Sequence, residues 1–330
     1  MVSRNDPLPC EPRLNMPESL SAWRTRLFLG TSSWSFPGWE GLVYDKAASE
    51  SILSRRGLSA YAQHPLLNAA GIDRGFYAPV SQTQFQQYAD QVPRDFRFLV
   101  KAPDLITGAT LRDESGRHGP PNPSHLDAQA AIAQFVEPCM NGLGERAGVL
   151  VFQFSPLPRA WLSDAPGWIA RLGDFLSRLP RGPCYAVELR DPALITPRLV
   201  RTLAETSTRY CISLHDRMPP IDRQLRALDA LDSSEPGPLI VRWNLHQGLG
   251  YAAARRQYAP FNRLIDEDPA TRQILAERAA ATILAGRSVT VIANNKAEGS
   301  APLTLLRLAE AIARSIEAGS AAADTGRSAS

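Results

Sequence analysis

Residues 148–154 read Gly-Val-Leu-Val-Phe-Gln-Phe, and residues 288–293 read Ser-Val-Thr-Val-Ile-Ala. Both runs are short and almost continuously apolar, which is typical of parallel strands covered on both faces. Six further runs of this kind recur along the chain, so that the sequence predicts eight strands. They span residues 27–34, 69–77, 96–102, 149–155, 185–190, 209–216, 239–245 and 288–295.

The segments between these runs carry apolar residues at helical spacing. One stripe contains Leu126, Ala130, Ala133, Met140 and Leu143. Others run from Ile169 to Leu179 and from Leu305 to Ile316, and a capping-box pattern pairs Ser81 with Gln84.

Eight alternations of strand and helix leave a closed barrel or an open doubly wound sheet. No Gly-rich phosphate fingerprint follows the first strand, which weakens the dinucleotide-binding alternative. We therefore predict an α/β fold, a single-domain (β/α)8 TIM-type barrel over residues 25–317. A flexible extension is expected at residues 1–24 and a disordered tail at residues 318–330.

The composition of the chain indicates which kinds of partner and which cellular compartment to expect. Its 36 Lys and Arg against 33 Asp and Glu give a formal net charge of +3, without a basic block, so nucleic acid is not the expected partner. No signal peptide or membrane-spanning run is evident. The cysteines, Cys10, Cys139, Cys184 and Cys211, form no Cys-x-x-Cys pair, and we expect reduced thiols in a cytoplasmic protein.

Loop lengths indicate which end of the barrel carries the site. The longest connections, residues 103–124 and 246–266, each follow a predicted strand, whereas the connections from helix to strand are short. Long loops in a compact domain are usually functional, and TIM barrels build their sites from the loops that follow strands. The site is therefore expected at the carboxyl ends of the strands.

Six motifs in the sequence resemble the YecE-like family (domain of unknown function 72). They are Gly-Thr-Ser-Ser-Trp-Ser-Phe-Pro-Gly-Trp at 30–39, Phe-Tyr at 76–77, Phe-Arg-Phe-Leu-Val-Lys-Ala-Pro at 96–103, Val-Phe-Gln-Phe at 151–154, Ala-Val-Glu-Leu-Arg at 186–190 and Asn-Asn at 294–295. The resemblance implies a TIM-type barrel and brings no established reaction. This chain departs from the family pattern with Gly71 in place of Glu, and with Asp191 and Asn244 where His is common.

Two residues are candidates for catalysis. Glu188 is the candidate acid or base, because a carboxylate within an apolar strand needs a partner or a purpose. Lys101 ends another predicted strand and is its candidate electrostatic partner. Arg190 lies two residues after Glu188 and shares its strand face, so a structural ion pair is the alternative interpretation.

A second set of residues is predicted to bind substrate. Its members lie near predicted strand ends and are Asp73, Tyr77, Arg190, His215, Arg242, Asn294 and Asn295. Because Arg supplies a planar fork of donors and Asn supplies amide donors, this set favours an anionic ligand. His215 and Asp216 are neighbours in a predicted strand, so only one of them is expected to point into the site.

The leading hypothesis is an enzyme acting on a small polar anionic metabolite, phosphorylated or carboxylated and sugar-like. One alternative is a metal-dependent phosphodiesterase or nuclease of the endonuclease-barrel type. The other is a non-catalytic ligand-binding relative. No ligand-spacing motif such as His-x-x-x-His marks a metal site, and we assign no metal ligands, no cofactor and no oligomeric state.

Overall fold

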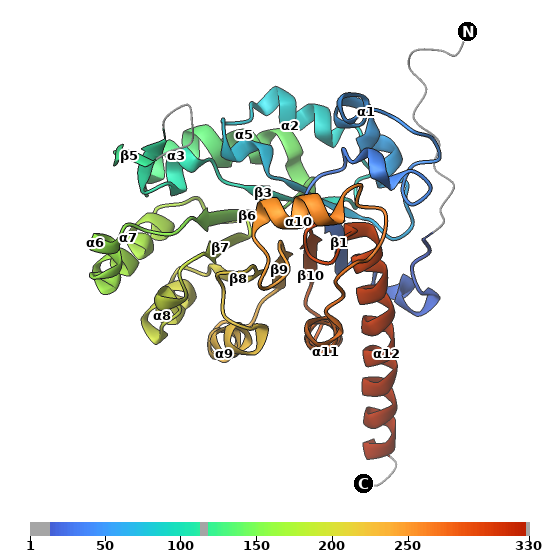
Figure 1. Ribbon diagram of the computed structural model, residues 1–330. Helices are drawn as coiled ribbons and strands as arrows, with labels where there is room; N and C mark the ends of the chain where they lie inside the picture. The colour runs from blue at the N-terminus through green and yellow to red at the C-terminus, as the bar shows by residue number, and fades with distance from the viewer. Residues whose placement is uncertain (1–13, 113–117, 328–330) are drawn as a thin grey trace. The chain divides into compact units, whose positions relative to one another are not determined.

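A computed structural model describes residues 14–112 and 118–327 of the chain. Eight parallel strands form a closed barrel in the order β1-β10-β9-β8-β7-β6-β3-β2, with helices around it (Figure 1). The predicted (β/α)8 fold class is confirmed. The barrel strands are β1 (Leu27–Thr31), β2 (Ala69–Ile72), β3 (Arg97–Lys101), β6 (Ala147–Phe154), β7 (Tyr185–Leu189), β8 (Arg209–Leu214), β9 (Leu239–Trp243) and β10 (Val289–Ala293).

The helices follow the strands in alternation. They are α1 (Glu50–Ala62), α2 (Gln82–Ala89), α3 (Asp104–Thr107), α4 (Ala128–Ala131), α5 (Glu137–Leu143), α6 (Arg159–Leu162), α7 (Ala165–Ser177), α8 (Pro197–Glu205), α9 (Ile221–Asp232), α10 (Tyr251–Tyr258), α11 (Pro269–Leu284) and α12 (Ala301–Arg327). A π-helical turn, Ile132–Val136, joins α4 to α5. The predicted capping box of Ser81 and Gln84 is present at the start of α2.

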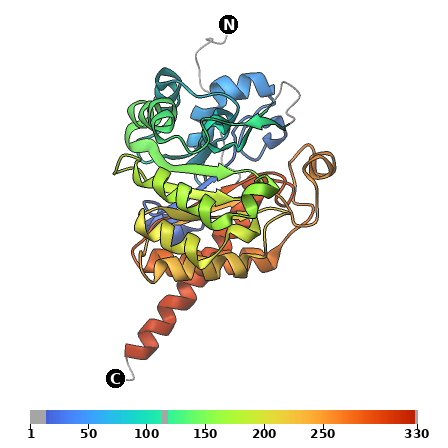
Figure 2. The same cartoon turned by 90° about the vertical axis from the view of Figure 1, so that its left-hand side faces the viewer.

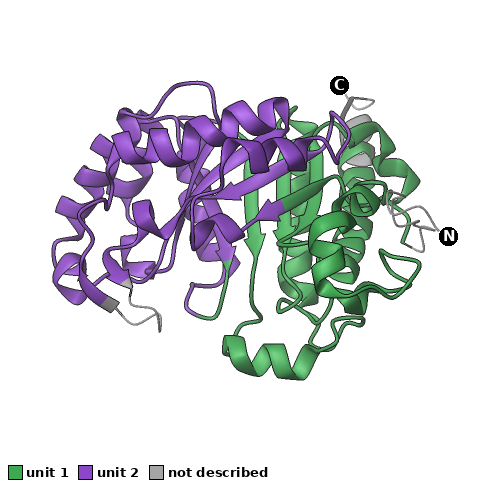
Figure 3. Cartoon of the chain, turned by 90° about the horizontal axis from the view of Figure 1, so that it is seen from above, with its two compact units in different colours: residues 1–70, 214–216, 237–330 green, residues 71–213, 217–236 purple. Residues whose placement is uncertain are grey.

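The chain divides into two compact units (Figure 3). Unit 1 comprises residues 1–70, 214–216 and 237–330, and unit 2 comprises residues 71–213 and 217–236. Within unit 1, β1 pairs with β10 over five residues and β10 pairs with β9. Within unit 2, β3 pairs with β6, β6 with β7, and β7 with β8.

Unit 2 has an aromatic core around Phe152 of β6. The ring of Phe152 makes edge contacts with Phe135 and with Phe175 of α7, at centroid distances of 5.7 and 5.1 Å. It also lies 5.9 Å from the ring of Tyr185 on β7. Buried aromatic pairs of this kind add about 0.5–1.5 kcal/mol each beyond the area they remove from water. They hold α7 and the helical segment 132–136 against β6 and β7.

In unit 1 the strand β1 approaches β2 so closely that only glycine fits at position 30. A Cβ atom on Gly30 would lie 2.0 Å from the carbonyl oxygen of Ala69. The next residue, Thr31, is held by Tyr61, whose hydroxyl accepts from the Thr31 backbone N–H at 2.9 Å and donates to Ala69 O at 2.9 Å. The Gly-Thr pair of the first motif is therefore explained by packing.

The strands end earlier than the sequence predicts. Strand β2 ends at Ile72 rather than 77, and a 3-10 turn, Arg74–Phe76, follows it. Strand β8 ends at Leu214 rather than 216. Six of the residues that we assigned to strand ends therefore follow their strands, namely Asp73, Tyr77, Arg190, His215, Asn294 and Asn295. Lys101, Glu188 and Arg242 lie within β3, β7 and β9.

Both long loops contain secondary structure. Residues 103–124 hold α3 and an antiparallel hairpin of β4 (Thr110–Arg112) and β5 (His118–Pro121), and residues 246–266 hold α10. No helix among the described residues has both the length and the apolar composition needed to cross a bilayer.

The ends of the described chain differ from the predicted boundaries. Residues Glu18–Trp23 form a 3-10 helix whose Leu20 is fully buried, although we placed residues 1–24 in a flexible extension. At the other end α12 continues to Arg327, ten residues past the predicted boundary at 317, and its last turns extend past α11 (Figures 1 and 2). Residues 1–13 and 328–330 lie outside the described residues, and flexibility of the two ends stays a prediction.

Candidate functional site

The nine residues singled out from the sequence divide between the two units. Unit 2 contains Asp73, Tyr77, Lys101, Glu188 and Arg190, and unit 1 contains His215, Arg242, Asn294 and Asn295.

In unit 2, Glu188 on β7 is completely buried and makes two strong contacts through one oxygen. Its Oε1 atom lies 2.6 Å from Nη2 of Arg190 and accepts a hydrogen bond of 2.9 Å from Oγ of Ser213 on β8. The expected ion pair between Glu188 and Arg190 is therefore present. Buried charges are tolerated when they are paired and hydrogen-bonded in this way.

Ser213 was not predicted from the sequence, yet its position is fixed by its surroundings. The side-chain amide of Gln224 on α9 binds the backbone of Ser213. Its Oε1 accepts from Ser213 N at 3.0 Å, and its Nε2 donates to Ser213 O at 2.9 Å. The same amide oxygen accepts from the hydroxyl of Tyr210 at 3.1 Å, and burial raises the pKa of Tyr210, which keeps it a donor. Because a lone serine in an apolar strand carries no distinguishing pattern, only the fold places it beside Glu188.

Lys101 is partly exposed at the end of β3, and its ammonium nitrogen lies 3.4 Å from the ring centroid of Phe76. A cation over an aromatic ring gains about 0.5–2 kcal/mol, depending on its exposure. Tyr77 is 87% exposed and packs only edge-on against Phe76, at 5.4 Å between ring centroids. Asp73 precedes the turn Arg74–Phe76, and its carbonyl accepts from Phe76 N.

One of the departures from the family pattern has a structural role in unit 2. Asp191 follows β7, and its Oδ2 accepts a hydrogen bond of 2.8 Å from the backbone N–H of Leu157 in the loop after β6. Near that loop lies a hollow of about 330 Å³ lined by residues 108–110 and 155–158. The carboxylate thus fixes one wall of a hollow beside the end of β6.

In unit 1, Arg242 on β9 is 2% exposed and stands opposite Ile292 of β10 in the strand register. Asn294 follows β10 and makes two hydrogen bonds through its side chain. Its Nδ2 donates to Oγ of Ser32 at 2.7 Å, and its Oδ1 accepts from Lys296 N at 3.0 Å. The side chain of Asn294 therefore joins the end of β10 to the segment after β1.

Asn295 is 1% exposed and binds structural partners. Its Oδ1 accepts from Nε1 of Trp39 at 3.2 Å and from the backbone N–H of Ala301, the first residue of α12, at 2.9 Å. Helix termini leave backbone N–H groups in need of acceptors, and Asn295 supplies one. Its amide nitrogen, which is buried, has no hydrogen-bond partner among the described residues.

Lys296 is a buried cation next to these asparagines. It is 6% exposed, and its Nζ lies 4.3 Å from the ring centroid of Tyr251, the first residue of α10. The neighbouring His246 places Nδ1 3.2 Å from Ala297 O, and its backbone N–H donates to Lys296 O at 2.9 Å. The loop after β9 is thereby fastened to the loop after β10.

A buried ion pair holds the loop after β10 against α11. Glu298 is fully buried, and its Oε1 lies 2.6 Å from Nη2 of Arg272 on α11 and accepts from Asp268 N at 2.7 Å. The backbone of Glu298 also accepts from Ile265 N.

The chain also packs closely at Gly38, where a Cβ atom would lie 1.7 Å from the carbonyl oxygen of Pro260.

The prediction that His215 and Asp216 face opposite ways is wrong. Their side chains are in close contact through His215 Nδ1 and Asp216 Oδ1. The alternation rule applies only within a strand, and β8 ends at Leu214. Each of the two side chains is about a quarter exposed.

His64 is buried and His125 is partly buried, both are hydrogen-bonded, and desolvation lowers the pKa of each to about 4. Nδ1 of His125 lies 3.1 Å from Gly108 O, and its Nε2 accepts from Nε1 of Trp168 at 3.1 Å, which fixes the neutral tautomer. In residues 14–112 and 118–327, no three or more His, Cys, Asp or Glu side chains form a group that could hold a metal ion.

Comparison with known proteins places the chain in a family. The family model described as "Protein of unknown function DUF72" matches residues 28–326. Similar solved structures are titled DUF72 family proteins. One, from Enterococcus faecalis, is 16% identical with a TM-score of 0.59, covering 87% of this chain and 95% of that one. Another, from Thermotoga maritima, is 18% identical with a TM-score of 0.56, covering 86% and 98%.

These structural likenesses are at low identity and support the barrel fold. No curated protein matches the chain. The family model, by contrast, covers nearly all of the barrel, from β1 to the last turn of α12. The chain belongs to the DUF72 family.

Proposed function

We propose that the protein binds a small anionic metabolite at the carboxyl ends of β9 and β10, through Arg242, Asn294 and Lys296. The observation that carries the proposal is the burial of two cations there, since Arg242 is 2% and Lys296 is 6% exposed. Sites of TIM barrels lie at this end of the strands, and phosphate groups often bind after the last two.

The chemistry of these groups favours a carboxylate or a phosphate. The guanidinium of Arg presents a planar fork that matches two oxygens of either group. An anion beside two buried cations is attracted more strongly than in water, because the protein interior screens opposite charges less. Asn294 is held at both ends of its amide, which reduces the entropy lost when a ligand binds.

As a separate proposal for unit 2, we infer that Glu188 acts as an acid or base, and Lys101 as an electrostatic group, in the turnover of a small anionic metabolite. Support comes from unit 2, where Arg190 and Ser213 hold the Glu188 carboxylate in a single orientation. Fixing a reactive group in this way is what general acid–base catalysis requires. Asp73, Tyr77 and His215 stay predicted substrate contacts, and a cytoplasmic location belongs to the same proposal.

Thermal unfolding in the presence of single anions tests the binding proposal. The panel contains inorganic phosphate, sulfate, citrate, malate and glucose 6-phosphate, each compared with sodium chloride at equal ionic strength. A ligand at about one hundred times its Kd stabilises the native state by about 2.7 kcal/mol, which raises the Tm by about 4 °C. Arg242→Gln and Lys296→Gln should abolish that rise, and Arg94→Gln, on the exposed surface, should keep it.

If none of the anions raises the Tm above the chloride control, the binding proposal is wrong. A ligand found in this way then serves to test turnover. Glu188→Gln should retain the ligand-induced rise while product formation falls at least about a hundredfold. Unchanged product formation in Glu188→Gln would remove Glu188 as the reacting group without affecting the binding proposal.

A further inference from the structure

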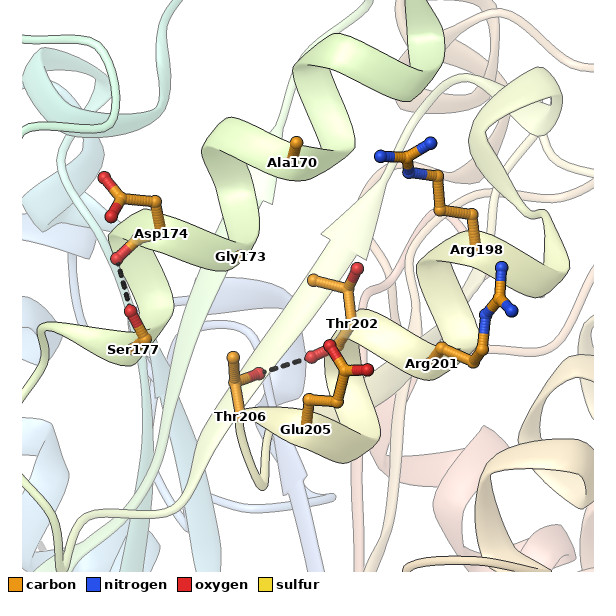
Figure 4. A pocket seen from close by; sticks show the side chains of 9 residues that line it. All are labelled: Ala170, Gly173, Asp174, Ser177, Arg198, Arg201, Thr202, Glu205 and Thr206. Carbon is orange, nitrogen blue, oxygen red and sulfur yellow. Dashed lines mark hydrogen bonds between the residues drawn. The ribbon is translucent and has the colours of Figure 1, made fainter.

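Two grooves flank helix α8 on the outer helices of unit 2. The groove between α7 and α8 has a volume of about 600 Å³ (Figure 4). Its charged lining residues are Asp174 and Glu205 against Arg198 and Arg201, so their charges cancel. The groove between α8 and α9 has a volume of about 520 Å³, and its lining, unlike that of the first groove, has a net positive charge.

The α8/α9 groove is lined by three arginines and by no acidic residue. Arg201 projects from α8, and Arg223 and Arg226 come from α9. The side chains of Arg201 and Arg223 are exposed. Arg226 meets Asp222 at 3.1 Å, but both side chains are more than half exposed, so that pair contributes little.

Apart from Thr196, the rest of the α8/α9 groove is aliphatic. Its apolar lining residues are Ile195, Pro197, Val200, Ala227 and Ala230. Val200 and Ala227 are partly exposed on the facing sides of the two helices, and Pro197 and Ala230 are exposed. The groove thus combines an apolar floor with a positively charged rim, and it stands open to solvent along the helices.

We propose that the α8/α9 groove docks an acidic amphipathic segment of a partner protein. Leucine-like side chains of the segment lie on the aliphatic floor, and its carboxylates meet Arg201 and Arg223. An amphipathic helix in an apolar groove is a common recognition mode, and opposite charge along the rim fixes partner and register. The proposal is independent of the anion site at β9 and β10.

The lining residues distinguish this occupant from two others. A single-stranded nucleic acid needs aromatic side chains on which its bases stack, and the groove has none. The chain also has a net charge of only +3, which is little for binding a phosphate backbone. A small inorganic anion would use the arginines and leave the aliphatic floor in water.

The test uses a synthetic peptide of about four helical turns. Leucine occupies one face and glutamate the other, and a fluorescein label reports binding by anisotropy. We expect saturable binding that weakens as salt is added. Arg201→Glu and Arg223→Glu should each weaken binding at least about tenfold, which corresponds to about 1.4 kcal/mol.

Arg198→Glu is the matched control, because it makes the same charge change on the same helix and lines only the neutral groove. Its effect should stay below about threefold. All three positions are exposed, and unchanged thermal unfolding would show that each variant is folded. Hydrogen exchange should slow in Pro197–Glu205 and Ile221–Asp232 when the peptide binds.

Three results would overturn the proposal. The first is no saturable binding of the Leu/Glu peptide, or equal binding by Arg201→Glu and Arg223→Glu. The second is equal binding of a peptide with lysine in place of glutamate, or with serine in place of leucine. The third is tighter binding of polyuridylate, which would identify a nucleic-acid surface instead.

Discussion

Replacing Arg272 by methionine should destabilise the protein strongly, because it leaves the Glu298 carboxylate buried without its counter-ion. Glu298 is fully buried, and the Arg272 side chain is only 11% exposed. After the replacement, Oε1 of Glu298 keeps one hydrogen bond, from Asp268 N at 2.7 Å, and Oε2 has no hydrogen-bond partner in the described chain. Breaking a buried ion pair on one side costs about 3–5 kcal/mol.

Urea unfolding followed by circular dichroism measures this cost. With a denaturant slope of about 3 kcal/mol/M, the midpoint should fall by about 1–1.7 M. Arg94→Met is the matched control, since Arg94 also pairs with a glutamate, Glu145, at 2.7 Å, but on the surface with side-chain exposures of 81% and 64%. Its midpoint should hardly move.

A double variant separates the lost charge pair from lost packing. Adding Glu298→Gln to Arg272→Met removes the uncompensated charge and keeps an acceptor for Asp268 N. It should recover part of the lost stability, because replacing both members of a buried pair is far less costly than removing one. If Arg272→Met moves the midpoint no more than Arg94→Met does, the buried pair stabilises the protein no more than the surface pair.

Three further predictions concern other parts of the chain. As pH falls from 6.5 to 4, the histidines of the unfolded state bind protons, whereas His64 and His125 of the folded state stay neutral. The free energy of unfolding should therefore fall by up to about 3 kcal/mol for each histidine. Urea titrations at a series of pH values measure this fall. Gly38→Ala should displace the segment around Pro260 and lower the Tm, because the new Cβ would lie 1.7 Å from a carbonyl oxygen. Cys139 should resist iodoacetamide at pH 8, followed by peptide mass spectrometry, because burial raises the pKa of its thiol to about 12.

Each of these predictions has a contrary outcome. If the free energy of unfolding does not change between pH 6.5 and 4, His64 and His125 are not held neutral in the folded state. His125→Gln is the control, and it should make the free energy of unfolding depend less on pH. An unaltered Tm in Gly38→Ala would mean that the segment moves without cost. Rapid alkylation of Cys139 in the native protein, at the rate seen in urea, would show that its surroundings open readily.

The fold could be predicted from the sequence because barrel strands are buried on both faces and therefore read as apolar runs. Runs such as 149–155 and 288–295 contain the observed β6 and β10 almost completely. Their ends were less predictable, since a strand stops where its neighbour stops offering hydrogen bonds. His215 shows the result: placed in a strand by its sequence, it lies beyond Leu214 and contacts Asp216.

The candidate site was partly predictable for a similar reason. Glu188 and Arg190 could be paired from their spacing of two in one predicted strand, because that contact is local. Ser213 comes from a different strand, and the structural role of Asn295 depends on Trp39, which lies 256 residues away in the chain. Neither contact leaves a trace in the local sequence, so both had to come from the structure.

The pairing of β1 with β10 has a consequence for how the chain is made. Leu27 and Val289 stand side by side in the sheet, although 262 residues separate them along the chain. Contacts so distant in sequence form slowly and late. During synthesis, β1 emerges from the ribosome long before β10 exists, whereas β3, β6, β7 and β8 all lie within residues 97–214. We therefore expect unit 2 to fold first, while one edge of β1 stays unpaired until β10 has been made.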